Sequence, residues 1–172
     1  MTDRDNGVGV LEEETRFVVY GVLLKNASNL TDAIRRRLGF CEDDTYIEIH
    51  VPDVVQSDGQ KLVLAAFVDG FKKLAKFLDE HGIQPKALVG ITHGGVAVWA
   101  GRYLNFVLTK DIEESELDEI TLRRINEGFA KTDRAARGKE RGPIYLCSQT
   151  FESFMQKFGS RTSAAAHAEA TA

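Results

Sequence analysis

The fold is decided by residues 85–95, which read Pro85-Lys86-Ala87-Leu88-Val89-Gly90-Ile91-Thr92-His93-Gly94-Gly95. The apolar run is short, rich in branched residues and entered through a proline, which predicts a buried strand over 87–92. Gly94 and Gly95 then let the backbone turn sharply and place free N–H groups at the start of the next helix. An anion or a polar ligand could sit there.

Strands and helices alternate on both sides of this stretch. The residue patterns predict strands over 16–24, 45–51, 106–108 and 143–147, and helices over 30–38, 62–81, 113–131 and 149–158. The prediction is one three-layer α/β domain spanning residues 16–159, with a mixed, mainly parallel sheet flanked by helices. A flexible N-terminal lead over residues 1–15 and a disordered tail over 160–172 complete the expected organisation.

Two of these strands suggest where a ligand would bind. If strands 45–51 and 87–92 are parallel neighbours joined by helix 62–81, their carboxyl ends share one edge of the sheet. Open α/β sheets usually bind ligands at that edge. The site is therefore expected between the ends of these two strands.

Composition excludes several classes of function. A net charge of -4 and a pI near 5.6 argue against a dedicated nucleic-acid binder, which usually has a strongly basic surface. The chain has neither an apolar leader segment nor 18 consecutive apolar residues, so secretion and membrane spanning are disfavoured. The two cysteines lie far apart, and a cytoplasmic location is expected.

Metal and thiol chemistry receive little support. His50 and His93, with Asp53 or Cys147 nearby, could hold zinc, but no motif spacing supports this, and no metal is predicted. A nucleophilic pair of Cys147 and His93 is chemically conceivable, because an imidazole can generate a thiolate. A strand cysteine flanked by apolar residues is more often an inert core residue.

A polar loop, Gln56-Ser57-Asp58-Gly59, joins strand 45–51 to helix 62–81, and strand 87–92 and the helix ending Arg102-Tyr103-Leu104-Asn105-Phe106 follow. This order, over about residues 40 to 110, resembles the central and C-terminal half of GNAT-type N-acetyltransferases. The same stretch is similar to the YkoP-like bacterial domains through Ile47-Glu48-Ile49-His50 and Val89-Gly90-Ile91-Thr92. The short link from residue 40 to residue 45 omits two strands of full GNAT members, so a shortened GNAT-like fold is expected.

The resemblance implies a cofactor site. The pyrophosphate loop of GNAT enzymes, R/Q-x-x-G-x-G/A, would fall on Gln56, Gly59 and Lys61, and the implied cofactor is acetyl-CoA or another acyl-CoA. Lys61 replaces the final Gly or Ala of that pattern. Its side chain would obstruct approach of the pyrophosphate to backbone N–H groups, although a lysine could also pair with phosphate.

The resemblance also implies catalytic residues. Glu48 would take the position of a general base and Tyr103 that of a general acid, since an amine that attacks a thioester must lose a proton and the thiolate must gain one. His93, at the end of its strand, is the third candidate. The simpler alternatives are a solvent-facing strand residue for Glu48 and an aromatic at the edge of the core for Tyr103.

Two functional hypotheses follow. The first is a GNAT-like protein that binds an acyl-CoA or related nucleotide-type ligand, either without catalysis or as a weak or degenerate acyltransferase with a small-molecule acyl acceptor. The second is a non-catalytic module that binds another protein or itself, as a homodimer, through an exposed sheet edge or the basic segment 131–141. The simpler interpretation of that segment is a mobile surface loop, and the alternative is that it binds a phosphorylated or acidic partner.

Overall fold

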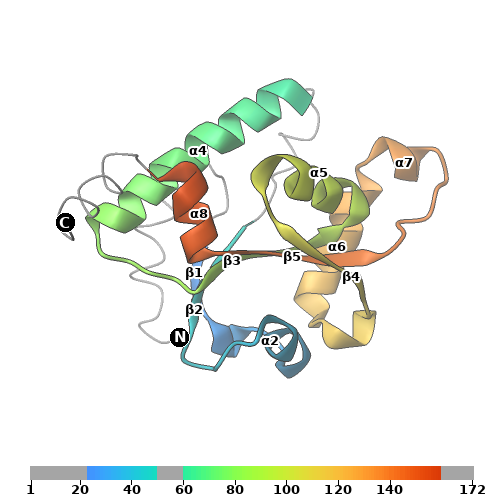
Figure 1. Ribbon diagram of the computed structural model, residues 1–172. Helices are drawn as coiled ribbons and strands as arrows, with labels where there is room; N and C mark the ends of the chain where they lie inside the picture. Colours follow the sequence, from blue (N-terminus) through green and yellow to red (C-terminus); the bar gives the residue numbers. More distant parts are fainter. Residues whose placement is uncertain (1–22, 50–59, 160–172) are drawn as a thin grey trace.

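Strand β3 (Ala87–His93) contains most of the stretch quoted above and lies in the middle of a five-stranded sheet. The computed structural model, shown in Figure 1, describes residues 23–49 and 60–159. The order across the sheet is β1 (Leu23–Asn26), β2 (Thr45–Glu48), β3, β5 (Ile144–Thr150) and β4 (Val107–Ile112). The α/β class and the mixed sheet flanked by helices are as predicted.

The directions of the strands differ from the prediction. Among the described strands, β2 and β3 form the one parallel pair, and the other three pairings are antiparallel. The expectation of a mainly parallel sheet is therefore wrong. The cause is β5, which is the last strand along the chain but lies between β3 and β4, antiparallel to both.

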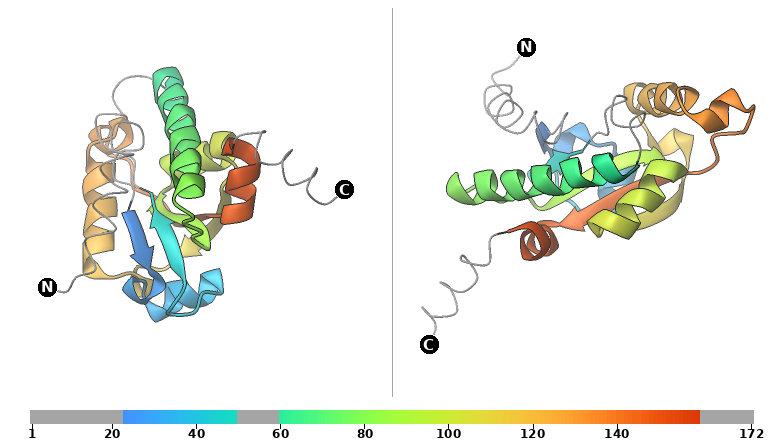
Figure 2. Two further views of the ribbon diagram at one scale, coloured as in Figure 1. Left: turned by 90° about the vertical axis from the view of Figure 1, so that its left-hand side faces the viewer. Right: turned by 90° about the horizontal axis from the view of Figure 1, so that it is seen from above.

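Helices cover both faces of the sheet, as the left view of Figure 2 shows. One face carries α4 (Gln60–Glu80), α5 (Gly94–Leu104) and α8 (Phe151–Phe158). The other face carries α2 (Asp32–Leu38) and α6 (Glu119–Ala130). The result is a layer of helices, a layer of strands and a second layer of helices.

The core beneath α4 and α8 is organised around Phe71, which is fully buried. The centre of its ring lies 5.9 Å from that of Phe67, 5.6 Å from Phe154 and 5.1 Å from Phe158, each in an edge-on arrangement. Such contacts contribute about 0.5–1.5 kcal/mol each beyond the burial of apolar area. They hold α8 against α4, which confirms that the apolar face of the last helix packs on the domain.

Local sequence signals fix the ends of two helices. α2 begins after Thr31, whose Oγ1 accepts a hydrogen bond from Ile34 N, and it ends at Gly39 with a φ of 69°. α4 is followed by Gly82 with a φ of 63°. Each glycine directly follows a predicted helix, 30–38 or 62–81, and glycine adopts this left-handed conformation without a steric penalty.

Strand β4 is longer than predicted. It extends to Ile112 rather than ending at residue 108, and its register against β5 shifts between Thr109 and Ile112. Asp111 within this irregularity has a positive φ of 64°. A bulge of this kind lets a strand continue past a local break in its ladder.

The segment after β4 also differs from the expected helix over 113–131. Glu113 and Glu116 close a separate short 3-10 turn, in which Glu113 N donates to Glu116 Oε2 at 2.9 Å, and α6 begins only at Glu119. Beyond α6, the connection predicted as a loop contains a short helix, α7 (Asp133–Ala136). Glu113 and Glu116 therefore cap the short 3-10 turn and do not belong to the first turn of α6.

Several predictions fall outside the described residues. They concern the lead over 1–15, most of the strand over 16–24, the tail over 160–172, and the loop residues Gln56 and Gly59. Among the helices that the structure describes, none combines the length and the apolar character needed to cross a membrane.

Replacing Phe71 by alanine is expected to lower the free energy of unfolding by about 3–5 kcal/mol, because it opens a cavity among the rings that join α4 and α8. Urea denaturation followed by circular dichroism measures this loss. Ile120→Ala, at an exposed position on α6, is the control and is expected to change stability by about 0.5 kcal/mol or less. Equal losses in the two variants would contradict this account of the core.

Candidate functional site

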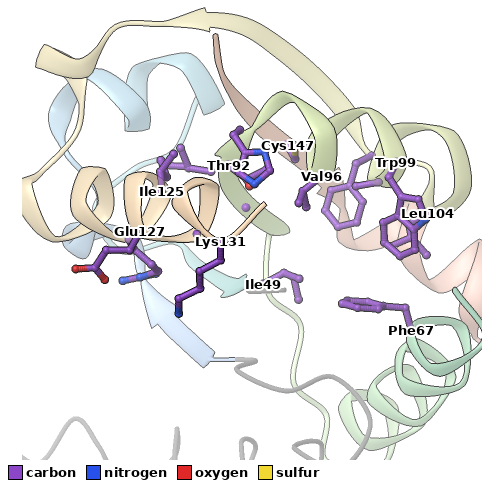
Figure 3. A pocket seen from close by; sticks show the side chains of 17 residues that line it. Ile49, Phe67, Thr92, Val96, Trp99, Leu104, Ile125, Glu127, Lys131 and Cys147 are labelled. Carbon is purple, nitrogen blue, oxygen red and sulfur yellow. The ribbon is translucent and has the colours of Figure 1, made fainter. Parts of the chain in front are cut away.

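A cavity of about 180 Å³ lies at the carboxyl ends of the parallel strands β2 and β3. This is the edge where the sequence predicts a ligand site, and Figure 3 shows the cavity from close by. The described residues that line it are Ile49, Phe67, Gly90, Ile91, Thr92, His93, Val96, Trp99, Ala100, Leu104, Phe106, Arg124, Ile125, Glu127, Gly128, Lys131 and Cys147.

One wall of the cavity is aromatic and aliphatic. Phe67 of α4 meets Trp99 of α5 edge-on, with 5.4 Å between the ring centres. In Figure 3 these two rings and Leu104 gather on one side of the open space, with Ile49 beside them. Such a wall suits an apolar or aromatic part of a ligand.

The opposite wall is polar and comes from α6 and the residue that follows it. Arg124, Glu127 and Lys131 line the cavity at positions one or two helical turns apart. Figure 3 shows Glu127 and Lys131 on the side away from Phe67 and Trp99. The cavity therefore offers an apolar end and a charged end to one ligand.

His93 stands at the boundary between β3 and α5. It is the last residue of the strand and the N-cap of the helix, and its side chain makes no capping hydrogen bond. The residue is only 7% exposed, and its ring meets Phe129 edge-on with 5.8 Å between the ring centres. Burial, with the positive charges of Arg141 and Arg134, holds the pKa of His93 below its ordinary value. The imidazole is therefore mainly neutral at neutral pH.

Glu48 does not face this cavity. Its Oε2 lies 2.6 Å from Lys25 Nζ and its Oε1 lies 2.9 Å from Arg124 Nη1. Tyr46, two residues earlier on β2, belongs to the core on the α2 and α6 side. Glu48 projects to that same side, where it is largely buried and paired with two cations. The alternative of a solvent-facing strand residue is therefore wrong.

Tyr103 lies on the other face of the sheet, on α5, and is 39% exposed. Its ring centre is 6.2 Å from that of Trp99, and the Arg102 guanidinium lies 5.8 Å from the Tyr103 ring centre. The structure thus places Glu48 and Tyr103 on opposite faces and does not bring them together as a base and an acid. Tyr103 fits the alternative of an aromatic at the edge of the core.

Only part of the predicted phosphate loop lies within the described residues. Gln56 and Gly59 lie outside the described residues, and Lys61 falls in the first turn of α4, with its side chain also outside the described part. Phe67 lies six residues further along the same helix, about 9 Å along its axis from Lys61. The helix that would follow the phosphate loop therefore supplies one wall of the cavity.

Cys147 lines the cavity but lacks the properties of a nucleophile. Burial raises the pKa of its thiol to about 12, whereas an activated cysteine has a lowered pKa. For metals, no group of three or more His, Cys, Asp or Glu side chains that could hold an ion occurs within residues 23–49 and 60–159. His50 and Asp53 lie outside these ranges.

The sequence interpretation missed most of the cavity wall. Trp99 was not a candidate, although Val96, Trp99 and Ala100 lie on one stripe of α5. Arg124, Glu127 and Lys131 follow one another at intervals of three and four residues, the spacing of one helix face. These stripes are visible in the sequence, but the surface that each one faces is not.

Comparisons with protein-family models, with curated proteins and with solved structures gave no match to this chain. The assignment of the site therefore depends on its geometry.

The pKa of His93 is expected to lie below 6.5, because burial and two nearby arginines disfavour the charged imidazole. NMR of the ring Cε1–H signal as a function of pH measures it, with the signal assigned by its loss in His93→Gln. The unfolded chain protonates His93 more readily than the folded chain does, because the pKa of His93 is lower in the folded state. The contribution of neutral His93 to the free energy of unfolding is therefore complete above pH 6.5 and is lost as the pH falls toward the folded pKa. A midpoint at or above 6.5 would contradict the burial of this ring.

The two cysteines are expected to react very differently. Cys41 is exposed and should react with a thiol reagent in the folded protein, whereas buried Cys147 should react only after denaturation. Counting reacted thiols with Ellman's reagent, before and after addition of guanidinium, tests this. Rapid reaction of the folded Cys41→Ser variant would show that Cys147 is accessible.

Proposed function

We propose that this protein binds an acyl-CoA or a related nucleotide-type ligand, with the acyl or other apolar group of the ligand seated in the cavity. The observation that carries the proposal is the cavity at the carboxyl ends of β2 and β3, with one apolar and one charged wall. This is the edge at which α/β sheets commonly bind ligands.

The size of the cavity limits what can enter it. Its volume of about 180 Å³ is close to that of engineered apolar cavities of about 150 Å³ that bind benzene. A short acyl chain or a single aromatic ring would fill it, whereas a whole nucleotide would not. The larger part of an acyl-CoA would lie outside, toward the start of α4, where the resemblance places the phosphate loop.

The same geometry suggests how a weak acyltransferase could work here. His93 lines the cavity with a mainly neutral imidazole, which can accept a proton from an amine that attacks a thioester. Glu48 is paired with Lys25 and Arg124 on the other face of the sheet. In this proposal His93 replaces Glu48 as the general base, and the imidazolium that forms returns the proton to the departing CoA thiolate in place of Tyr103.

The alternative is a non-catalytic module that binds a protein partner or a second copy of this chain. The observation in its favour is β4, an edge strand with Val107 68% exposed. However, the irregularity at Asp111 and the charge of Lys110 interrupt this edge, as in strands that resist pairing with another chain. Light scattering tests self-association, against which a strict monomer would count, and a pull-down from native cell extract tests a protein partner.

Trp99 is the only tryptophan of the chain and lies in the cavity wall, so its fluorescence should report binding. Titration with CoA, acetyl-CoA and longer acyl-CoAs is expected to show saturable changes, with affinity rising from CoA to the short acyl thioesters. The reason is that each added methylene, once buried, contributes about 0.8 kcal/mol. No saturable change with any of these ligands would refute the proposal.

Val96→Phe is expected to weaken acyl-CoA binding by about tenfold or more, because the larger side chain would occupy part of the cavity. The matched control is Ile120→Phe, an exposed position on α6 that does not line this cavity. Both variants should first be shown to fold by circular dichroism. Equal affinities in the two variants would place the acyl group elsewhere.

A further inference from the structure

A second, larger cavity of about 850 Å³ adjoins the first, where β3 passes into α5. Its walls come from three parts of the chain: the start of α5, the end of α6 with α7, and the segment that leads into β5. Figure 1 shows α5, α6 and α7 beside one another at this end of the molecule. The cavities share two residues, His93 and Lys131. A group bound in the second cavity would therefore lie next to a group bound in the first.

Gly94 and Gly95, which line this second cavity, are the first two residues of the eleven-residue helix α5. The N-cap residue, His93, provides no side-chain hydrogen bond to this turn. A Cβ on Gly95 would lie 3.7 Å from the His93 ring, whereas a Cβ on Gly94 would lie 3.3 Å from the Tyr145 ring, so the open approach to the backbone is at Gly95. The positive end of the helix dipole thus faces the cavity without a capping side chain.

His93 provides a second, independent indication of a ligand. The residue is more than nine-tenths buried and lines both cavities, yet no described residue forms a hydrogen bond with its ring nitrogens. Within the described residues, the fully buried side-chain atoms that lack a partner belong to Gln149, so the ring nitrogens of His93 keep access to the cavities. A neutral imidazole at this position has one N–H group to donate to a bound molecule.

The charges around the cavity are mainly positive. Lys131, Arg134 and Arg141 line it, and Asp133 is the one carboxylate among the described lining residues. Arg141 is held by Glu114, with 2.7 Å between Nη2 and Oε1, and by the side chain of Asn126. Arg134 is exposed and forms no ion pair with any residue that the structure describes. It is therefore available to an anion from solution.

We propose that this second cavity binds the phosphate group of a small phosphorylated molecule, held by the first-turn N–H groups of α5, the His93 ring and Arg134. A guanidinium and a helix N-terminus are both well suited to phosphate oxygens. The volume greatly exceeds that of the ion alone, so the phosphate belongs to a larger molecule. Its place beside the first cavity makes this molecule the acyl acceptor; that last assignment rests on the proposed function, whereas the phosphate site does not.

Inorganic phosphate, titrated at constant neutral pH and followed through the His93 ring signals in NMR, tests the site. A bound anion favours the charged imidazole, so the signals are expected to move toward their protonated positions and to saturate. Sodium chloride at the same ionic strength is the control for general screening of charge. No saturable shift, or the same shift with chloride, would overturn the proposal.

Arg134→Gln is expected to weaken phosphate binding about tenfold, through loss of one charge-assisted contact. The matched control is Arg137→Gln, at an exposed arginine just after α7 that does not line the cavity, with an expected change within about twofold. Equal effects would show that only the general charge of the segment matters.

The acyl-CoA titration of Trp99 separates the two proposals. If the protein binds acyl-CoA but not inorganic phosphate, the phosphate site is refuted and the proposed function stands. Phosphate binding without acyl-CoA binding would leave the phosphate site standing and refute its assignment to an acyl acceptor.

Discussion

The structure depends on the unequal pairing of β3 with its two neighbours. On one side β3 pairs with β5 over seven residues, from Ala87 to His93, and on the other side its registered pairing with β2 covers three, from Ala87 to Val89. β5 therefore supports β3 well beyond the end of β2. The residues from Gly90 to His93 lie in this extension of β3 and line the first cavity, and α5 begins directly after them. Both cavities depend on a strand that is longer than its parallel partner.

Helix α6 links the two faces of the sheet. Arg124 holds Glu48 on one face and also lines the apolar cavity, and Phe129 packs against the ring of His93. A substitution at Arg124 would remove one of the cations that pair with the largely buried Glu48 and would also alter the charged wall of the cavity. Loss of a partner from a buried ion pair is costly because a charge remains without compensation. The stability of the sheet and the charge of the cavity wall are therefore coupled through this residue.

The sequence reveals the local elements well and their long-range pairing poorly. Strand 87–92, the caps at Gly39 and Gly82 and the docking of α8 follow from residue type and spacing, which act over a few residues. The position of β5 depends on contacts with residues far away in the chain, and no local signal encodes them. His93 was identified because two glycines follow it. The sequence indicates Arg134 only as part of the basic segment 131–141 and does not mark Trp99 as a site residue, since the importance of both comes from the elements that lie opposite them. The family resemblance points instead to Glu48 and Tyr103, which the sheet separates.

The central place of β5 has a consequence for the order in which the molecule can assemble. Synthesis delivers β3 and β4 first, and both must keep a backbone edge unsatisfied until residues 144–150 emerge and insert between them. Closing such a distant pairing is slow, and open strand edges are prone to associate with other chains in the meantime. Cys147 in the wall of the apolar cavity and Tyr145 in that of its neighbour both arrive with this final strand. Neither cavity can therefore be complete on a nascent chain before the sheet itself is closed.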